Sequence, residues 1–142
     1  MELIHYGCKK INPRKFTPIK NRKWCKPYGG FWSSPVNSKY GWKDFCETDM
    51  TSGIPKLFVK FKINKYARIL KIDTLYDLEK VVSKYRIKSY SCLGDLINYE
   101  QLSKDYDAIW LTDEGQCSTR LSEPNLYGWD VETVFIMNPK II

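Results

Sequence analysis

The sequence predicts a single α+β domain, residues 1–142, built on one mostly antiparallel, split β-sheet with flanking helices. Its 142 residues are the length of one ordinary domain. Hydrophobic residues make up 43% and charged residues 27%, near the averages for globular proteins, so the disordered and fibrous classes are excluded. The strands expected along the chain outnumber the helices, and the helices lie between groups of strands.

Strands are expected where apolar residues alternate with polar ones, or run together, between turn residues. These segments are residues 3–6, ending at Gly7; 31–34, stopped by Pro35; 57–63, where apolar residues alternate with lysines; 67–72; 107–111; and 131–137, ended by Pro139. Helices are expected over residues 38–48 with Ser38 as N-cap, from Asp73-Thr74 to about residue 85, and over residues 95–103. Residues 113–130 are polar and hold two Gly and one Pro, which predicts a long loop.

Several classes of protein are disfavoured by the composition. No apolar run approaches the ~18–20 residues of a transmembrane helix, and the N-terminus lacks the layout of a signal peptide, so no membrane partner is expected. The five cysteines are widely spaced and form no Cys-x-x-Cys pair, so neither a disulfide framework nor a zinc site is indicated. His5, the single histidine, cannot build a metal site alone. We therefore expect a reducing, cytoplasmic location and no metal.

The net charge of +7 is concentrated in residues 1–30. Against the single acid Glu2, this segment carries Lys9, Lys10, Arg14, Lys15, Lys20, Arg22, Lys23 and Lys26. The rest of the chain balances fifteen basic and fifteen acidic residues. Three prolines in the same segment predict a loop. This loop is either a solvated surface loop or a contact for the phosphates of a dinucleotide or a nucleic acid.

Three features carry candidate chemistry. His5 ends the first strand beside a glycine, and the second strand, Gly30-Phe31-Trp32-Ser33-Ser34, is followed by Tyr40, Trp42 and Phe45 on the expected helix. Glu132 lies in the apolar segment 131–136, where a charged carboxylate costs free energy unless it is paired or faces a cleft. By strand alternation Glu132 points to the side of Val134 and Ile136, or it lies at the open end of the strand. It is therefore either a solvated strand end or a carboxylate aimed into a pocket.

In this order, the three features resemble the diphtheria-toxin-like branch of the ADP-ribosyltransferases, which is named for a His, an aromatic residue (usually Tyr) and a Glu on three strands. His5-Tyr6-Gly7 is similar to the first motif, with one residue inserted before the glycine. The second strand, followed by Lys39-Tyr40-Gly41-Trp42, is similar to the second motif with Trp32 in the usual Tyr position, and Val131-Glu132-Thr133 is similar to the third. Asp130 stands two residues before Glu132, where arginine-modifying members carry Glu. The resemblance covers most of the chain.

The resemblance implies a mono-ADP-ribosyltransferase, an enzyme that moves ADP-ribose from NAD to a macromolecular acceptor, either protein or nucleic acid. Glu132 and His5 would be catalytic: Glu132 would stabilise the oxocarbenium-like ribose, and His5 would bond the adenosine ribose. Trp32 would sandwich the nicotinamide with Trp42 or, as alternatives, Tyr40 or Phe45. The further NAD-binding residues implied are Tyr6 and Gly7 for the carboxamide, Ser33 as a support for Glu132, and Arg14, Lys9, Lys10 or Arg22 for the pyrophosphate.

The setting implied is that of a phage effector, an anti-CRISPR-type inhibitor or an intracellular toxin. It would act as a monomer in the cytoplasm of the producing cell or of an infected host cell. Residues 115–128 would form the acceptor loop, because they precede the strand of Glu132. Two other functions remain open: an NAD glycohydrolase that uses water as the acceptor, and a non-catalytic module that binds nucleic acid.

Overall fold

The structure, a computed structural model, describes residues 1–22, 26–48, 53, 55–87 and 96–142. These form a six-stranded sheet in the order β3-β1-β2-β8-β7-β4. Its strands are β1 (Glu2–Tyr6), β2 (Phe31–Pro35), β3 (Phe58–Lys62), β4 (Ile69–Ile72), β7 (Ala108–Leu111) and β8 (Thr133–Ile136). The pair β4–β7 is parallel and the other neighbours are antiparallel, which confirms the α+β class and the mostly antiparallel sheet. The sheet was expected to be split but is continuous in the described residues, because β1 and β2 pair at Leu3–Pro35 and Ile4–Ser34.

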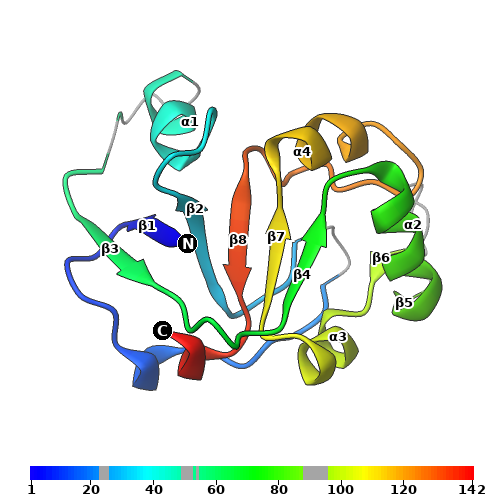
Figure 1. Cartoon of the computed structure of the whole chain (residues 1–142), viewed down its shortest axis with the longest axis horizontal. Helices are drawn as coiled ribbons and strands as arrows, with labels where there is room; N and C mark the ends of the chain where they lie inside the picture. The colour runs from blue at the N-terminus through cyan, green and yellow to red at the C-terminus, as the bar shows by residue number, and fades with distance from the viewer. Residues whose placement is uncertain (23–25, 49–52, 54, 88–95) are drawn as a thin grey trace.

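The helices are α1 (Trp42–Thr48), α2 (Leu75–Lys84), α3 (Tyr99–Asp105) and α4 (Asp113–Thr119). Helix α1 lies near β2, and α2 and α4 lie near β4 and β7 (Figure 1). The other elements are a two-stranded ribbon of β5 (Arg86–Ile87) and β6 (Leu96–Ile97) and 3-10 turns at Pro13–Lys15 and Pro139–Ile141. The expected helix after Asp73 is confirmed as α2, where Thr74 and Asp77 form a reciprocal capping box. In the described ranges, no helix has the length and apolar character needed to cross a lipid bilayer.

Two helix starts differ from the prediction. Helix α1 begins at Trp42 rather than after Ser38, because Ser34 Oγ accepts the Trp42 N–H and the Asp44 carboxylate accepts the Gly41 N–H. Helix α3 begins after Asn98, whose side chain accepts the Gln101 N–H. The preceding residues 96–97 are strand, and the expected start at Asp95 lies outside the described residues.

The prediction of a loop over residues 113–130 is wrong for its first third, which is helix α4. Thr112 caps this helix by accepting the Gly115 N–H at 3.1 Å, and two acidic residues in the first turn favour its N-terminus. The last strand is also shorter than expected, since β8 begins at Thr133. Glu132 therefore lies immediately before the strand.

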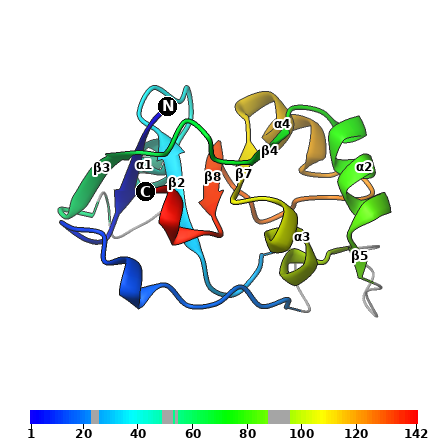
Figure 2. The same cartoon turned by 60° about the horizontal axis from the view of Figure 1, so that its bottom comes forward.

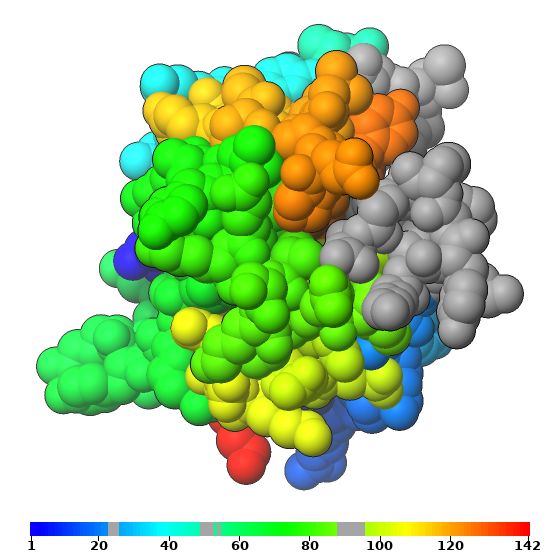
Figure 3. All heavy atoms as spheres, turned by 90° about the vertical axis from the view of Figure 1, so that its right-hand side faces the viewer, coloured from blue at the N-terminus to red at the C-terminus, as the bar shows by residue number. Residues whose placement is uncertain are grey.

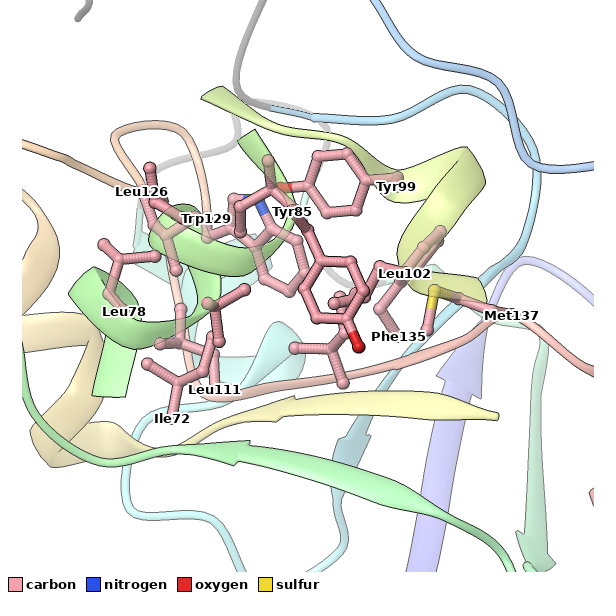
Figure 4. Close-up of a cluster of buried hydrophobic side chains, with 14 residues drawn as sticks. Ile72, Leu78, Tyr85, Tyr99, Leu102, Leu111, Leu126, Trp129, Phe135 and Met137 are labelled. Carbon is pink, nitrogen blue, oxygen red and sulfur yellow. The ribbon is translucent and has the colours of Figure 1, made fainter. Parts of the chain in front are cut away.

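One face of the sheet carries the larger hydrophobic core. Phe135 and Leu111 from the strands pack with Leu78 of α2 and with Trp129, whose side chain is only 1% exposed (Figure 4). Figure 3 shows α2, α3 and the segment after α4 packed side by side over this part of the molecule. The opposite face carries a second cluster, in which Val134 and Ile136 pack with Leu3, Ala108 and Ile141. The C-terminal 3-10 turn that supplies Ile141 lies over β2 and β8 (Figure 2).

The start of β7 is fastened to its neighbours by Asp107. Its carboxylate accepts hydrogen bonds from the Arg68 guanidinium at 3.1 and 3.2 Å and from the Asn138 amide at 2.8 Å. These donors, with Arg68 as the main cause, lower the pKa of Asp107 from 3.8 to about 2. The ion pair therefore holds the ends of β4, β7 and β8 together at neutral pH.

The basic N-terminal segment is a loop, as predicted, with one short 3-10 turn. Phe16 anchors it by packing on Phe31 with ring centroids 5.3 Å apart. Lys20 forms an ion pair with Glu100 at 2.9 Å, and the Arg22 guanidinium lies 4.9 Å from the centre of the Tyr28 ring. Lys23, Cys25 and Cys92 lie outside the described residues.

Candidate functional site

A hollow of about 310 Å³ opens where β1 ends, β2 passes and α1 begins. We name it the tryptophan pocket; its lining residues are His5, Tyr6, Lys26, Trp32, Trp42, Cys46 and Pro55. Four of these, His5, Tyr6, Trp32 and Trp42, are residues that the sequence singled out. Burial raises the pKa of the Cys46 thiol, so this side chain is not a thiolate nucleophile at neutral pH.

Each of the two indoles of the pocket packs against other aromatic rings. Trp32 lies against Phe135 and Trp129, with ring centroids 4.4 and 4.8 Å apart. Trp42 meets Phe45 of its own helix edge to face at 5.6 Å. Its Nε1 is buried, and no residue in the described ranges accepts its hydrogen bond. A buried donor without a partner costs free energy, so an acceptor that reached this atom would stabilise the protein.

Lys26 places a cation against both indoles. Its Nζ lies 5.7 Å from the centre of the Trp32 ring and 5.6 Å from that of Trp42, within the range of a cation–π interaction. The same ammonium forms an ion pair with Asp130 Oδ2 at 3.1 Å. Two aromatic faces of the pocket and the Asp130 carboxylate, which lies outside the lining itself, therefore surround one ammonium group, and together they are complementary to a positive charge.

His5 presents a defined hydrogen-bonding state to the pocket. Its Nδ1 is 2.7 Å from the Trp32 carbonyl oxygen, which can only accept, so Nδ1 carries the proton. Burial lowers the pKa of His5, and the bond to Trp32 offsets only part of this effect. The imidazole is thus neutral at pH 7, and its Nε2 is an acceptor for a donor such as a ribose hydroxyl.

A second hollow, of about 730 Å³, contains Glu132. We call it the acidic cleft; its charged lining residues are Glu2, Lys39, Lys71, Asp73, Asp113, Glu114 and Glu132. Glu132 is 8% exposed, and its Oε1 accepts the indole N–H of Trp110 at 2.9 Å. Burial, followed by the charges of Asp113 and Glu114, raises the pKa of Glu132 above its ordinary value, while Trp110 and Lys39 oppose the shift.

The structure does not bring Glu132 together with the pocket residues. Trp32 pairs with Phe135 and packs in the larger core, whereas Glu132 contacts Trp110, which packs against the opposite face of the sheet. The three residues from Glu132 to Phe135 also span about 10 Å of extended chain. The carboxylate that pairs with Lys26 of the pocket is that of Asp130, which is not itself a lining residue.

The other predicted site residues lie elsewhere. Ser33 is buried and donates to the Val134 carbonyl, whereas Ser34 is the serine that reaches residue 132, through its carbonyl oxygen. The Gly7 N–H, expected to hold a carboxamide, donates to the Leu57 carbonyl at 2.8 Å. Among the described residues, Tyr40 and Arg14 are not part of the lining of either hollow.

No common site for Lys26 and Asp130 is expected from the sequence. They are separated by 104 residues, and no local pattern connects positions so far apart. Only weak indications of this pair are present in the sequence: Lys26 is the basic residue nearest to the second-strand motif, and Asp130 follows an aromatic residue.

The substitution Glu132→Gln tests the charge state of the acidic cleft. Folding raises the pKa of Glu132, so the free energy of unfolding falls as pH rises above about 4.5. This decrease is complete once the pH exceeds the pKa of Glu132 in the folded protein. Gln keeps an oxygen for Trp110 and removes the charge, so we expect the melting temperature at pH 7 to rise on the order of 2 °C. The gain should vanish near pH 4, where the wild-type carboxyl is protonated as well.

Glu114→Gln is the matched control, because this side chain lines the same cleft but is 71% exposed. It should change the melting temperature at pH 7 less than Glu132→Gln does, because the repulsion of Glu132 that it removes and the favourable charge at the start of α4 that it also removes act in opposite directions. A lower melting temperature for Glu132→Gln at pH 7 would show that the fold stabilises the ionised carboxylate.

No protein-family model, curated protein or solved structure matches this chain. The site is therefore interpreted from its own geometry.

Proposed function

We propose that the chain is an NAD-dependent mono-ADP-ribosyltransferase that binds the nicotinamide of NAD in the tryptophan pocket. The observation that carries the proposal is the Lys26 ammonium, which lies 5.7 and 5.6 Å from the two indole rings and 3.1 Å from Asp130. Nicotinamide in NAD is a flat cation that would take the place of this ammonium. Exchange of one cation for another keeps the charge balance of the pocket and gains stacking area on Trp32 and Trp42.

Other polar groups support the same pose. The orphan Nε1 of Trp42 is suited to donate to the carboxamide oxygen, and the acceptor Nε2 of His5 to take a ribose hydroxyl proton in a hydrogen bond. Lys26, once displaced, stays close enough through its flexible stem to contact the pyrophosphate. These pairings favour Lys26 over Arg14 as the phosphate contact, because Arg14 lies in the 3-10 turn of the N-terminal loop.

The reaction breaks the bond between ribose C1′ and the nicotinamide nitrogen. The bonding electron pair leaves with neutral nicotinamide, an oxygen or nitrogen of the acceptor forms the new bond to C1′, and the acceptor proton passes to a base. The ribose becomes positive in the transition state, so a nearby carboxylate lowers the barrier. The position of Asp130 favours it for this role. The assignment of Glu132 from the sequence stays a prediction, as do the cytoplasmic location and the monomeric state.

The proposal is tested by NAD titration followed by nicotinamide release, using wild type and Trp42→Ala. Loss of one face of the sandwich should weaken NAD binding about tenfold or more. Trp110→Phe is the control, because it also removes a partly exposed indole but lies in the acidic cleft. It should bind NAD like wild type. Equal NAD affinity in Trp42→Ala and wild type, or no NAD binding at all, would overturn the proposal.

A non-catalytic binding module is the second candidate, and the placement of Glu132 favours it. A pure binder needs no carboxylate beside the aromatic pocket, and Glu132 faces a different hollow. The nicotinamide assay separates the candidates: release that requires cell lysate indicates transfer, and release in buffer alone indicates hydrolysis or automodification. Binding without release indicates the module.

A further inference from the structure

A third hollow, of about 640 Å³, lies next to the tryptophan pocket, along β1 and β3 beside α1. Tyr6, Trp42 and Pro55 line both hollows, so the two are adjacent. We call the third hollow the lysine groove, after Lys43, Lys56 and Lys60 in its lining.

The aromatic part of the groove follows from strand register. Tyr6 pairs with Phe58, and Ile4 pairs with Lys60, so these four side chains share the face of the sheet beside α1. The Tyr6 and Phe58 rings lie 6.1 Å apart. Phe58 is 50% exposed, which leaves a large apolar ring open to a ligand in the middle of a basic surface.

The charge of the groove is positive in its net effect. Among its lining residues, Asp44 is the acid, and its carboxylate is already engaged as the cap that accepts the Gly41 N–H at 2.8 Å. Lys43 lies 4.0 Å from Glu47 on the same helix. Neither Lys56 nor Lys60 has an ion-pair partner in the described part of the chain. Two ammonium groups without ion-pair partners therefore flank an aromatic pair in which Phe58 is exposed and Tyr6 is half-buried.

We propose that the lysine groove binds single-stranded nucleic acid, with bases stacked on Phe58 and Tyr6 and phosphates on Lys56, Lys60 and Lys43. Lysines interleaved with exposed rings are what a single strand requires, because phosphates alternate with flat bases along it. An acidic peptide would use the lysines but would leave Phe58 without a partner. The bound strand would also be the acceptor of ADP-ribose, because the groove lies beside the tryptophan pocket. This second part of the proposal rests on the proposed function. Binding of the strand itself does not depend on NAD.

The test is fluorescence anisotropy with a labelled oligothymidylate of about twelve nucleotides and its oligouridylate counterpart, over a series of NaCl concentrations. The double variant K56Q/K60Q should weaken binding about tenfold and lower the salt slope by about 1.4, the value for two lost phosphate contacts on a single strand. Phe58→Leu should weaken binding about tenfold through lost stacking. The matched control is K65Q/Y66L, which removes an exposed lysine stacked at 4.9 Å on an exposed ring next to β3. It should bind like wild type.

Several results would overturn the proposal. They are the absence of oligonucleotide binding, equal weakening by the control and the groove variants, and equal competition by an oligoglutamate of the same length, which would indicate an acidic protein partner. The melting temperature of each variant establishes whether it is folded. If Phe58→Leu is not folded, K56Q/K60Q decides the outcome. NAD titration of wild type keeps the two proposals apart: oligonucleotide binding with no NAD binding supports the groove and ends the transferase proposal. NAD cleavage with no oligonucleotide binding does the reverse.

Discussion

We expect Asp130→Asn to lower the proposed release of nicotinamide from NAD about a hundredfold, the size of effect seen when one group that stabilises transition-state charge is removed. The reason is position: Asp130 Oδ2 lies 3.1 Å from the ammonium whose place the nicotinamide would take. Because Asn has nearly the same shape, the loss should fall on kcat, with the KM for NAD changed only a few-fold. The fold should be little affected, since the partly exposed ion pair with Lys26 contributes less than about 1 kcal/mol.

Glu132→Gln is the matched control for this result, because the same chemical change is made two residues away, in the acidic cleft. Its rate should stay within a few-fold of wild type. The opposite pattern, with Glu132→Gln inactive and Asp130→Asn active, would restore the assignment that the sequence resemblance implied. Full activity in both variants would mean that neither carboxylate takes part in the cleavage.

Gly115→Ala destabilises the protein by about 3 kcal/mol, at the upper end of the cost of overpacking. On an exposed helix the same change is favourable by roughly 0.5–1 kcal/mol, so the sign is reversed here. An added Cβ would lie 2.1 Å from the Ile72 carbonyl oxygen and 3.0 Å from Leu111 Cδ1, and the first of these atoms is backbone. Helix α4 would have to move away from β4 and β7.

Urea unfolding of Gly115→Ala and of Cys117→Ala measures this effect. Cys117 lies on the same helix but is exposed, so its substitution should leave the midpoint almost unchanged. A midpoint for Gly115→Ala equal to that of the control would show that α4 is not in close contact with the sheet.

Short-range rules predicted much of the fold. The strand segments and α2 follow from alternation and capping, because these signals involve residues within four positions of one another. Helix α4 escaped the prediction because Gly115 suggests a turn in sequence, although in the fold it is required by the close approach of the helix to Ile72. The start of α1 escaped because its capping atom, Ser34 Oγ, belongs to the preceding strand.

The candidate site could be predicted only in part. His5, Trp32 and Trp42 were found because each lies in a recognisable local motif, and the fold places all three around one pocket. The Lys26–Asp130 pair and the Glu132–Trp110 hydrogen bond depend on which strands are neighbours and on which face each side chain lies. A sequence without its sheet order does not contain that information, which is why the Glu132 carboxylate was expected in the same pocket as Trp32 and Trp42, although only the backbone of Glu132 approaches the predicted site residues, at Tyr40.

The position of β8 in the sheet has a consequence for how the protein forms. This strand follows every other strand of the sheet in the chain, yet it lies between β2 and β7 and joins the two halves. Its partner in β2 is about a hundred residues earlier, so the pairing closes a long loop and is expected to come late and slowly. During synthesis, the strands β1, β2 and β3 on one side, and β4 and β7 on the other, have unpaired edges until residues 133–136 have been made. The nascent chain thus depends on its final strand both to complete the hydrogen-bonded ladder and to cover the edges through which it would otherwise associate with other chains.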